Sequence, residues 1–370
     1  MQKDNNENYS SDSPIKDPQK DRFQRFEFSK RIAETIIQRK TEESIVIGIY
    51  GDWGEGKTSV LNFIEEHLSK NANIISCKFN PWRFQDETQL LVGFFKLLAT
   101  QLGKSITKRA EKIGELFSEY AEILIPNITV GGIIEFNTGQ SLKKLAEKVA
   151  KVDIEEQKKR IEKILEEEKK RVVIFIDDID RLDKKEVQAV FKLVKLTGDF
   201  SFTSYILAFD EKMVAKVIGE IYEDGGEQAG RNFLEKIIQV PLRLPLAQKD
   251  ALKNFCFEQV KNAIHLNNIH LPEEQARRFV NEFTTNILAR LSTPRIAVRY
   301  GNALAFALPL LNKEINIADL MLIEAVKIFY PDLYIFIRDN PSYFVQSFSI
   351  IDLRACKKLR FSQYEMNVSD

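Results

Sequence analysis

Short apolar runs alternate with stretches of helical period along the first two thirds of the chain. The apolar runs are rich in β-branched residues and predict five strands, at residues 44–50, 72–80, 171–180, 203–210 and within 231–245. Between them, apolar residues recur at spacings of three and four, which predicts helices. Strands that alternate with helices indicate an α/β fold, a parallel sheet with helices on both faces.

The pattern also divides the chain into regions. Residues 1–21 are polar, contain two prolines and lack the apolar run of a signal peptide, so we expect a disordered tail. Residues 22–247 form the predicted α/β core, with a charged helical insert at about 104–170. Its Lys and Glu pairs are typical of a solvated helix, and a partner-binding helix is the alternative. Residues 248–370 are almost wholly helical, and we interpret them as a helical lid and a C-terminal helical region.

Composition narrows the class of protein. Lys+Arg and Asp+Glu both number 54, so the neutral net charge does not support nucleic-acid binding. The three cysteines form no CxxC pair, which excludes the usual zinc and disulfide patterns and favours a reducing cytoplasm. The longest apolar candidate, 121–136, is interrupted by Pro126 and is shorter than the roughly 20 residues that a spanning helix needs. We therefore predict a cytoplasmic protein without a transmembrane span.

One glycine-rich stretch, "GDWGEGKTS", lies between the first predicted strand and a helix. It fits the phosphate-loop pattern G-x-x-x-x-G-K-[ST], in which backbone N–H groups and the helix N-terminus bind phosphates. We expect Lys57 to contact the β- and γ-phosphates and Thr58 to bind Mg²⁺. The predicted nucleotide contacts are Gly51, Asp52, Trp53, Gly54, Glu55, Gly56, Lys57, Thr58 and Ser59.

Glu55 adds a negative charge to a loop that binds phosphate, and we expect its side chain to point outward because the backbone makes the cradle. Trp53 either packs over the loop or offers a stacking surface.

A phosphate loop that uses Mg²⁺ needs a carboxylate at the end of a neighbouring strand. The run "VVIFIDD" supplies two. We assign Asp177 to Mg²⁺ and Asp178 to polarising the attacking water, where many ATPases carry Glu. The strand at 72–80 comes between the two motifs in the sequence, which predicts an inserted strand and the sheet order 5-1-4-3-2.

Two other classes of nucleotide-binding protein fit less well. The guanine-reading motif N-K-x-D is absent, so ATP is the expected nucleotide. The run "GGEQ" at 225–228 follows the acid strand, whereas the signature loop of transporter ATPases precedes it. We interpret it as a flexible surface loop.

The motifs "GDWGEGKTS", "FNPWRF", "VVIFIDDIDRLD", "ILAFD" and "FLEKIIQVPLRLP" together resemble the KAP family of P-loop NTPases, which is related to AAA+ and STAND ATPases. The resemblance implies phosphate contacts at the loop and Mg²⁺ and water handling at Asp177 and Asp178. It implies that Asp210 senses the γ-phosphate and that Arg295 contacts it when the lid closes. It places Arg231 where related ATPases present an arginine to the next subunit.

The resemblance leaves some residues without a definite role. Asp180 and Arg181 match an acidic string, and Trp82 is expected to pack beneath the sheet edge. Bacterial members of the family are associated with mobile elements and phage defence.

The leading hypothesis is a Mg²⁺-dependent ATPase that couples its nucleotide state to lid closure or assembly. Catalysis is assigned to Lys57, Asp178 and Arg295, with a protein partner or self-association as the output. A nucleotide-gated binding module that does not hydrolyse ATP is the second hypothesis. An ATP-driven nucleic-acid motor is the third, which the neutral charge disfavours.

Overall fold

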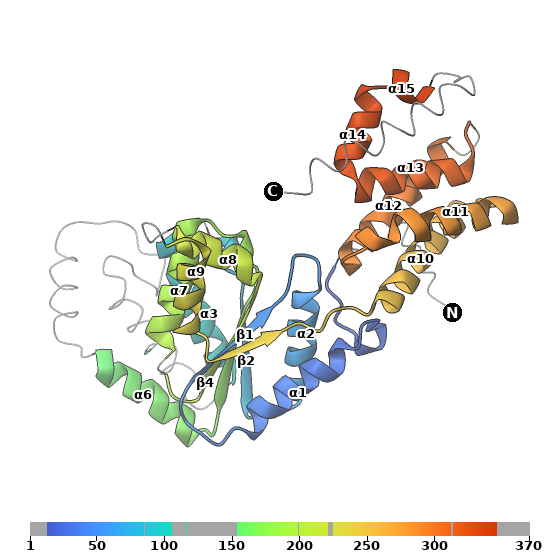
Figure 1. The fold of residues 1–370 in the computed structure, drawn as a ribbon. Coiled ribbons are helices and arrows are strands. Elements are labelled where there is room, and N and C mark those ends of the chain that lie inside the picture. The colour runs from blue at the N-terminus through green and yellow to red at the C-terminus, as the bar shows by residue number, and fades with distance from the viewer. Residues whose placement is uncertain are drawn as a thin grey trace, which may run out of the picture. The chain divides into compact units, whose positions relative to one another are not determined.

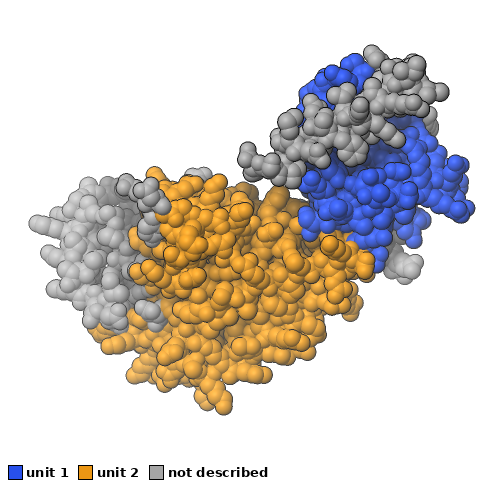
Figure 2. Space-filling view, viewed as in Figure 1, with its two compact units in different colours: residues 1–11, 253–292, 296–370 blue, residues 12–252, 293–295 orange. Residues whose placement is uncertain are grey.

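The computed structural model describes residues 13–84, 86–105, 116, 154–198, 200–220, 225–311 and 314–345. The chain divides into two compact units, which Figure 2 colours separately. The sheet unit contains residues 12–252 and 293–295, and the helical unit contains residues 1–11, 253–292 and 296–370.

A five-stranded parallel sheet forms the centre of the sheet unit (Figure 1). Its strands are β1 (Ile45–Tyr50), β2 (Ile74–Phe79), β3 (Arg171–Ile176), β4 (Thr203–Phe209) and β5 (Val240–Arg243). They lie in the order β2-β3-β4-β1-β5, which confirms the predicted order 5-1-4-3-2 read from the other edge.

The position of each strand in the sheet explains its sequence pattern. The inner strands β1, β3 and β4 are buried along almost their whole length, as strands covered on both faces must be. The edge strands β2 and β5 alternate between more and less buried positions. Pro241 lies in β5, because an edge strand tolerates the loss of one backbone donor.

Helices cover both faces of the sheet (Figure 1). On one face, α1 (Arg25–Gln38) and α2 (Lys57–Leu68) pack against a core that includes Ile49 and Phe175. On the other face lies a second core that includes Ile174 and Phe209. The helices of that face are α3 (Glu87–Ser105), α6 (Ile154–Glu167), α7 (Lys184–Thr197), α8 (Glu211–Gly219) and α9 (Gly226–Glu235). The unit is therefore a three-layer α/β fold, as predicted.

The glycine-rich segment at 225–228 differs from its prediction as a flexible surface loop. It forms the start of α9, which begins at Gly226. A Cβ atom at Gly230 would lie 1.8 Å from the carbonyl oxygen of Ala215, and one at Gly219 would lie 1.9 Å from that of Gly226. The glycines thus allow α8 and α9 to pack with their backbones in contact.

Residues 13–21 were predicted to belong to a disordered tail, and the structure differs there too. They include a 3-10 turn at Pro18–Lys20. The amide of Ile15 donates to Ser59 Oγ at 3.0 Å, and its carbonyl accepts from Asn62 Nδ2 at 3.2 Å. These hydrogen bonds fix the segment against α2, while residues 1–12 lie outside the described part of the chain.

The helical unit confirms the helical pattern of the C-terminal third. It contains α11 (Glu273–Asn286), α13 (Ile317–Phe329), α14 (Pro331–Asp339), α15 (Ser342–Val345) and most of α10 (Lys249–Leu266) and α12 (Pro294–Leu311). Its core is aromatic: Phe283 stacks on Tyr300 at 5.5 Å and meets Phe329 edge-on at 5.7 Å. The hydroxyl of Tyr300 donates to the carbonyl oxygen of Met321 at 2.8 Å.

The insert predicted at 104–170 is described only in part. Its last section is the helix α6, as expected, whereas the apolar stretch 121–136 lies outside the described residues. Among the residues that are described, no helix has the length and apolar character needed to cross a membrane.

Candidate nucleotide site

The phosphate loop connects the carboxyl end of β1 to the first residue of α2. Gly54 and Gly56 have φ angles of +87° and +92°, which other residues rarely adopt. Gly56 is the N-cap of α2, and no side chain caps this end of the helix. The first N–H groups of α2 therefore lack side-chain acceptors, which is the usual form of an anion site at a helix N-terminus.

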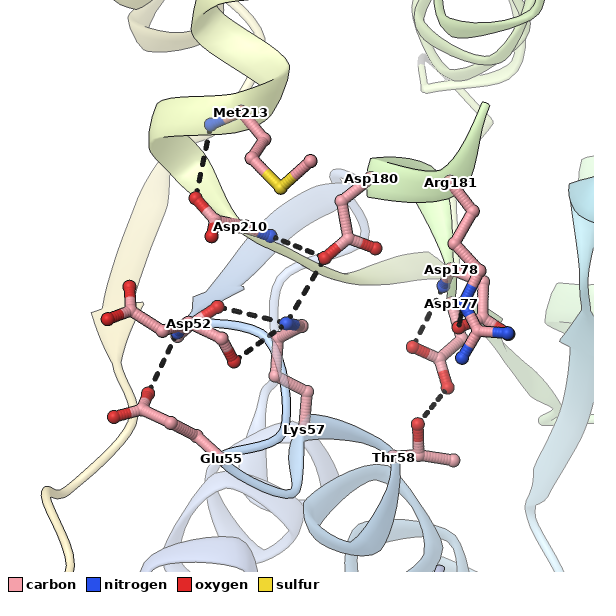
Figure 3. Close-up of polar contacts among 11 residues, drawn as sticks. Asp52, Glu55, Lys57, Thr58, Asp177, Asp178, Asp180, Arg181, Asp210 and Met213 are labelled. Atoms are coloured by element: carbon pink, nitrogen blue, oxygen red, sulfur yellow. Dashed lines mark hydrogen bonds and ion pairs between the residues drawn. The ribbon is translucent and has the colours of Figure 1, made fainter. Parts of the chain in front are cut away.

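Lys57, which was predicted to contact the β- and γ-phosphates, is buried inside the phosphate loop. Its Nζ donates to the carbonyl oxygens of Gly51 at 2.9 Å and Asp52 at 3.2 Å. It also forms an ion pair with Asp180 Oδ2 at 3.2 Å, and the two side chains are 8% and 4% exposed (Figure 3). The structure thus assigns Asp180 a partner that the sequence did not indicate.

Asp180 also connects the loop to the next strand. Its Oδ2 accepts the backbone N–H of Asp210 at 3.2 Å. The carboxylate of Asp210 in turn caps α8 by accepting the N–H of Met213 at 3.1 Å. Asp210 was predicted to sense the γ-phosphate, and in the structure its carboxylate serves as a helix cap.

The structure brings together Thr58 and Asp177, the two residues that were predicted to bind Mg²⁺. Thr58 Oγ1 donates to Asp177 Oδ2 at 2.7 Å, and Asp177 Oδ1 accepts the N–H of Asp178 at 2.9 Å. Burial raises the pKa of Asp177, and the hydrogen bond from Thr58 opposes that shift. A hydroxyl and a buried carboxylate are oxygen donors of the kind that Mg²⁺ prefers, and Mg²⁺ needs few protein ligands because it keeps water and phosphate. These residues fit the ion.

Asp178 is held by two neighbours. Its Oδ1 pairs with Arg181 Nε at 2.8 Å, and its Oδ2 accepts from Asn80 Nδ2 at 3.0 Å. Asn80 was missed by the sequence analysis. The available signal was its place directly after β2, because the sheet order puts the end of β2 beside the end of β3.

Trp82 does not pack beneath the sheet edge as predicted. Asn80 accepts the N–H of Trp82 and starts a 3-10 turn at Pro81–Arg83 that directly follows β2. Trp82 is 57% exposed, and the centroid of its ring lies 5.1 Å from the guanidinium carbon of Arg181. Trp82 therefore covers the arginine that holds Asp178.

Glu55 does not point outward. It is 7% exposed, and its Oε2 accepts the N–H of Asp52 at 2.9 Å, which closes the loop on itself. Arg25, which the sequence analysis missed, is buried behind the loop, where a Cβ atom at Gly56 would lie 2.7 Å from its Nη1. Burial lowers the pKa of Arg25, and the charge of Glu55 opposes that shift. A buried positive charge thus offsets the acid in the loop.

Arg295, expected to contact the γ-phosphate, and Arg231, expected to face the next subunit, have other partners here. Arg295 lies over Trp53, with its guanidinium carbon 4.1 Å from the ring centroid. Arg231 pairs with Glu211 at 2.9 Å and with Glu227 at 2.7 Å. Those ion pairs account for Arg231 within one chain, without a neighbouring subunit.

Comparison with known families decides the class of protein. A model of the KAP family P-loop domain matches residues 25–359. The chain belongs to the KAP family. It is thus a P-loop NTPase.

Individual relatives give the range of similarity for this KAP protein. It is 26% identical over 353 residues to the phage T7 exclusion protein of Escherichia coli K12, covering 87% of this chain and 46% of that one. The chain thus spans about half the length of that relative.

Solved structures resemble the chain more weakly. The ORC2 protein of Aeropyrum pernix has a TM-score of 0.41 at 12% identity, with 82% of this chain and 67% of that one covered. A Walker-type ATPase of Pyrococcus abyssi has a TM-score of 0.38 at 15% identity, with 90% and 80% covered. RuvB of Thermotoga maritima has a TM-score of 0.38 at 11% identity, with 85% and 73% covered.

Proposed function

We propose that this KAP protein binds ATP with Mg²⁺ and hydrolyses it. The observation that carries the proposal is the meeting of the two motifs: Thr58 Oγ1 lies 2.7 Å from Asp177 Oδ2, and Lys57 lies beside the same acidic turn. Lys57 supplies a cation and Thr58 a hydroxyl, and the end of β3 supplies two carboxylates. Phosphoryl transfer uses groups of these kinds.

Phosphate binding starts from the loop backbone and Lys57. The N-terminus of α2 attracts the anion, and the glycines allow the backbone to approach it. The Lys57 ammonium has Asp180 as a counter-charge until phosphate oxygens compete for it. Thr58 and Asp177 are the residues that hold Mg²⁺. When bound, the ion neutralises charge on the β- and γ-phosphates.

Asp178 is the proposed base. Its carboxylate accepts a proton from the attacking water, and the pairs with Asn80 and Arg181 orient it. Each oxygen already accepts one hydrogen bond, so only its second lone pair remains for the attacking water. The same observation favours a second candidate, a nucleotide-gated switch that binds ATP and hydrolyses it hardly at all.

Release of inorganic phosphate separates the two candidates. We expect wild-type protein to release phosphate from ATP and Asp178→Asn to bind ATP normally but to release phosphate about 10²- to 10⁴-fold more slowly. Asp332→Asn, an exposed acid of the helical unit, is the matched control and should behave as wild type. If the wild type binds ATP and releases no phosphate, the switch is the function.

The output of the cycle is proposed from the two-unit architecture and the curated relative. Nucleotide state would be passed to the helical unit, acting as a lid, or to self-association or a protein partner in the cytoplasm. Because the relative is a phage T7 exclusion protein, we propose phage exclusion as the setting. Phage T7 should form fewer plaques on cells that express the wild type than on cells that express Lys57→Ala. Equal plating would reject this setting without bearing on ATP binding.

A further inference from the structure

The tip of the phosphate loop carries an exposed tryptophan with an arginine on its face. Trp53 is 53% exposed, and the guanidinium carbon of Arg295 lies 4.1 Å from the centroid of its ring. A guanidinium at this distance over an indole makes a cation–π contact, which is strongest with tryptophan. The loop therefore presents a positively charged group that is distinct from Lys57.

The chain path around Arg295 supports a specific contact. Thr293–Arg295 belong to the sheet unit, although the residues on both sides of this segment belong to the helical unit. The neighbouring loop residue, Gly54, leaves room for the segment: a Cβ atom there would lie 2.8 Å from Arg295 Cβ and 3.3 Å from Thr293 Oγ1. The glycine at this position thus serves both the loop conformation and the approach of residues 293–295.

We propose that Trp53 is a positioning residue for Arg295 and that the two act as a unit in recognising the γ-phosphate. The inference rests on the proposed ATP site. The indole contacts the face of the guanidinium, whereas the N–H donors that form paired hydrogen bonds to phosphate lie in its plane. A rigid, flat partner thus limits the orientations of a long side chain without using those donors.

The position of Trp53 gives the pair its role. The carbonyl of the preceding residue, Asp52, accepts a hydrogen bond from Lys57 Nζ at 3.2 Å, so the indole is attached next to the backbone that holds the catalytic lysine. An arginine held there adds positive charge on the loop side of the bound phosphates. The extra charge favours ATP over ADP, because ADP lacks the γ-phosphate.

A double-mutant cycle on the ratio of ADP to ATP dissociation constants, measured by calorimetry, tests the proposal. Trp53→Ala and Arg295→Ala should each lower the preference for ATP by about two- to fivefold, the range of a cation–π contact. The double variant should lose no more than the larger single loss, and Trp53→Phe should recover part of the preference. Arg299→Ala, an exposed arginine one turn further along α12, is the control and should leave the ratio unchanged.

If the fold-loss in the double variant equalled the product of the two single fold-losses, the proposal would be overturned, because residues that act independently multiply their effects on the ratio. An unchanged ratio in Trp53→Ala would overturn it as well. Failure of the ATP site itself is a different result: Lys57→Ala would then bind ATP as tightly as wild type. If Lys57→Ala loses binding and Trp53→Ala keeps the wild-type ratio, the site stands and the role of Trp53 does not.

Fluorescence gives a readout that a purely structural role would not move. The chain contains two tryptophans, so a Trp82→Phe background reports on Trp53 alone. We expect ATP to change its emission more than ADP does, and Arg295→Ala in this background to remove that difference. Equal responses to ATP and ADP, or a difference that survives Arg295→Ala, would contradict the proposal.

Discussion

At the scale of single residues, three aspartates that are close in sequence have three different partners. Asp177 binds Thr58, Asp178 binds Asn80 and Arg181, and Asp180 binds Lys57. The strand pattern before "DDID" is enough to predict Asp177, because it places an acid at the strand end. The partner of Asp180 depends on the 3-10 turn at Ile179–Arg181, which no periodicity in the sequence indicates.

Asp177 carries a predictable cost of burial. Its pKa is raised, so the folded protein favours the protonated carboxyl group. Protonation of Asp177 therefore stabilises the folded state at low pH, and this stabilisation is lost as the pH rises through the raised pKa. At neutral pH without Mg²⁺, Asp177→Asn should therefore melt at a higher temperature than wild type, with the difference shrinking toward pH 4. The hydroxyl of Thr58 can donate or accept, so the hydrogen bond to position 177 persists.

Thermal melts with and without Mg²⁺ and ATP check this prediction. The wild type should gain stability from Mg²⁺ and ATP, and Asp177→Asn should gain much less. A variant that melts below the wild type at neutral pH would show that the carboxylate is stabilising in the absence of the ion.

Substitution of Asp180 should lower the stability of the folded protein, in contrast to substitution of Asp177. Asp180→Asn leaves the buried ammonium of Lys57 without its counter-charge, and removing one member of a buried pair costs about 3–5 kcal/mol. The carbonyl acceptors of Gly51 and Asp52 remain, which reduces the loss. ATP should raise the melting temperature of this variant more than that of wild type, because phosphate restores the counter-charge.

Chemical denaturation with and without ATP measures both quantities. Glu273→Gln, which breaks an exposed pair with Arg277, is the matched control and should change the unfolding free energy by less than about 1 kcal/mol. Equal effects of the two substitutions would contradict the buried pairing of Lys57 with Asp180.

At the scale of elements, the sequence was enough to predict the strands but not the start of one helix. Five apolar runs predicted five strands because both the burial and the β-branched residues of a parallel sheet are local properties. The start of α9 was missed because glycine disfavours helices on its own. Contact with α8, which is a tertiary property, overrides that preference and requires the glycines. The prediction for Trp82 was wrong for a similar reason, because the residue lies in a turn begun by Asn80 and is exposed.

The contact between α8 and α9 predicts the effect of one added methyl group. Gly230→Ala would place a Cβ atom 1.8 Å from the carbonyl oxygen of Ala215, so the two helices must separate. We expect a loss of about 1–3 kcal/mol in the free energy of unfolding, as for overpacking in a core. Gln228→Ala, an exposed change in the same helix, should alter it by less than about 0.5 kcal/mol. A Gly230→Ala variant as stable as wild type would contradict the packing described here.

At the scale of the whole molecule, the phosphate loop, the acid strand and residues 293–295 belong to one unit, while the remaining C-terminal helices form another. The motifs were enough to predict the KAP family and the sheet order. The return of three residues to the sheet unit was not predictable, because it depends on where the chain crosses between units. The sheet unit thus contains the phosphate loop and also a short segment from the C-terminal third.

Calorimetric titration of Mg²⁺ and ATP into wild type and Lys57→Ala tests whether this loop binds the nucleotide. The wild type should bind ATP in a Mg²⁺-dependent manner, and Lys57→Ala should bind at least about tenfold more weakly, as expected for the loss of charge-assisted hydrogen bonds. Lys70→Ala, an exposed lysine that follows α2, is the control and should bind as wild type does. Binding by Lys57→Ala with wild-type affinity and Mg²⁺ dependence would contradict the assignment of this loop as the nucleotide site.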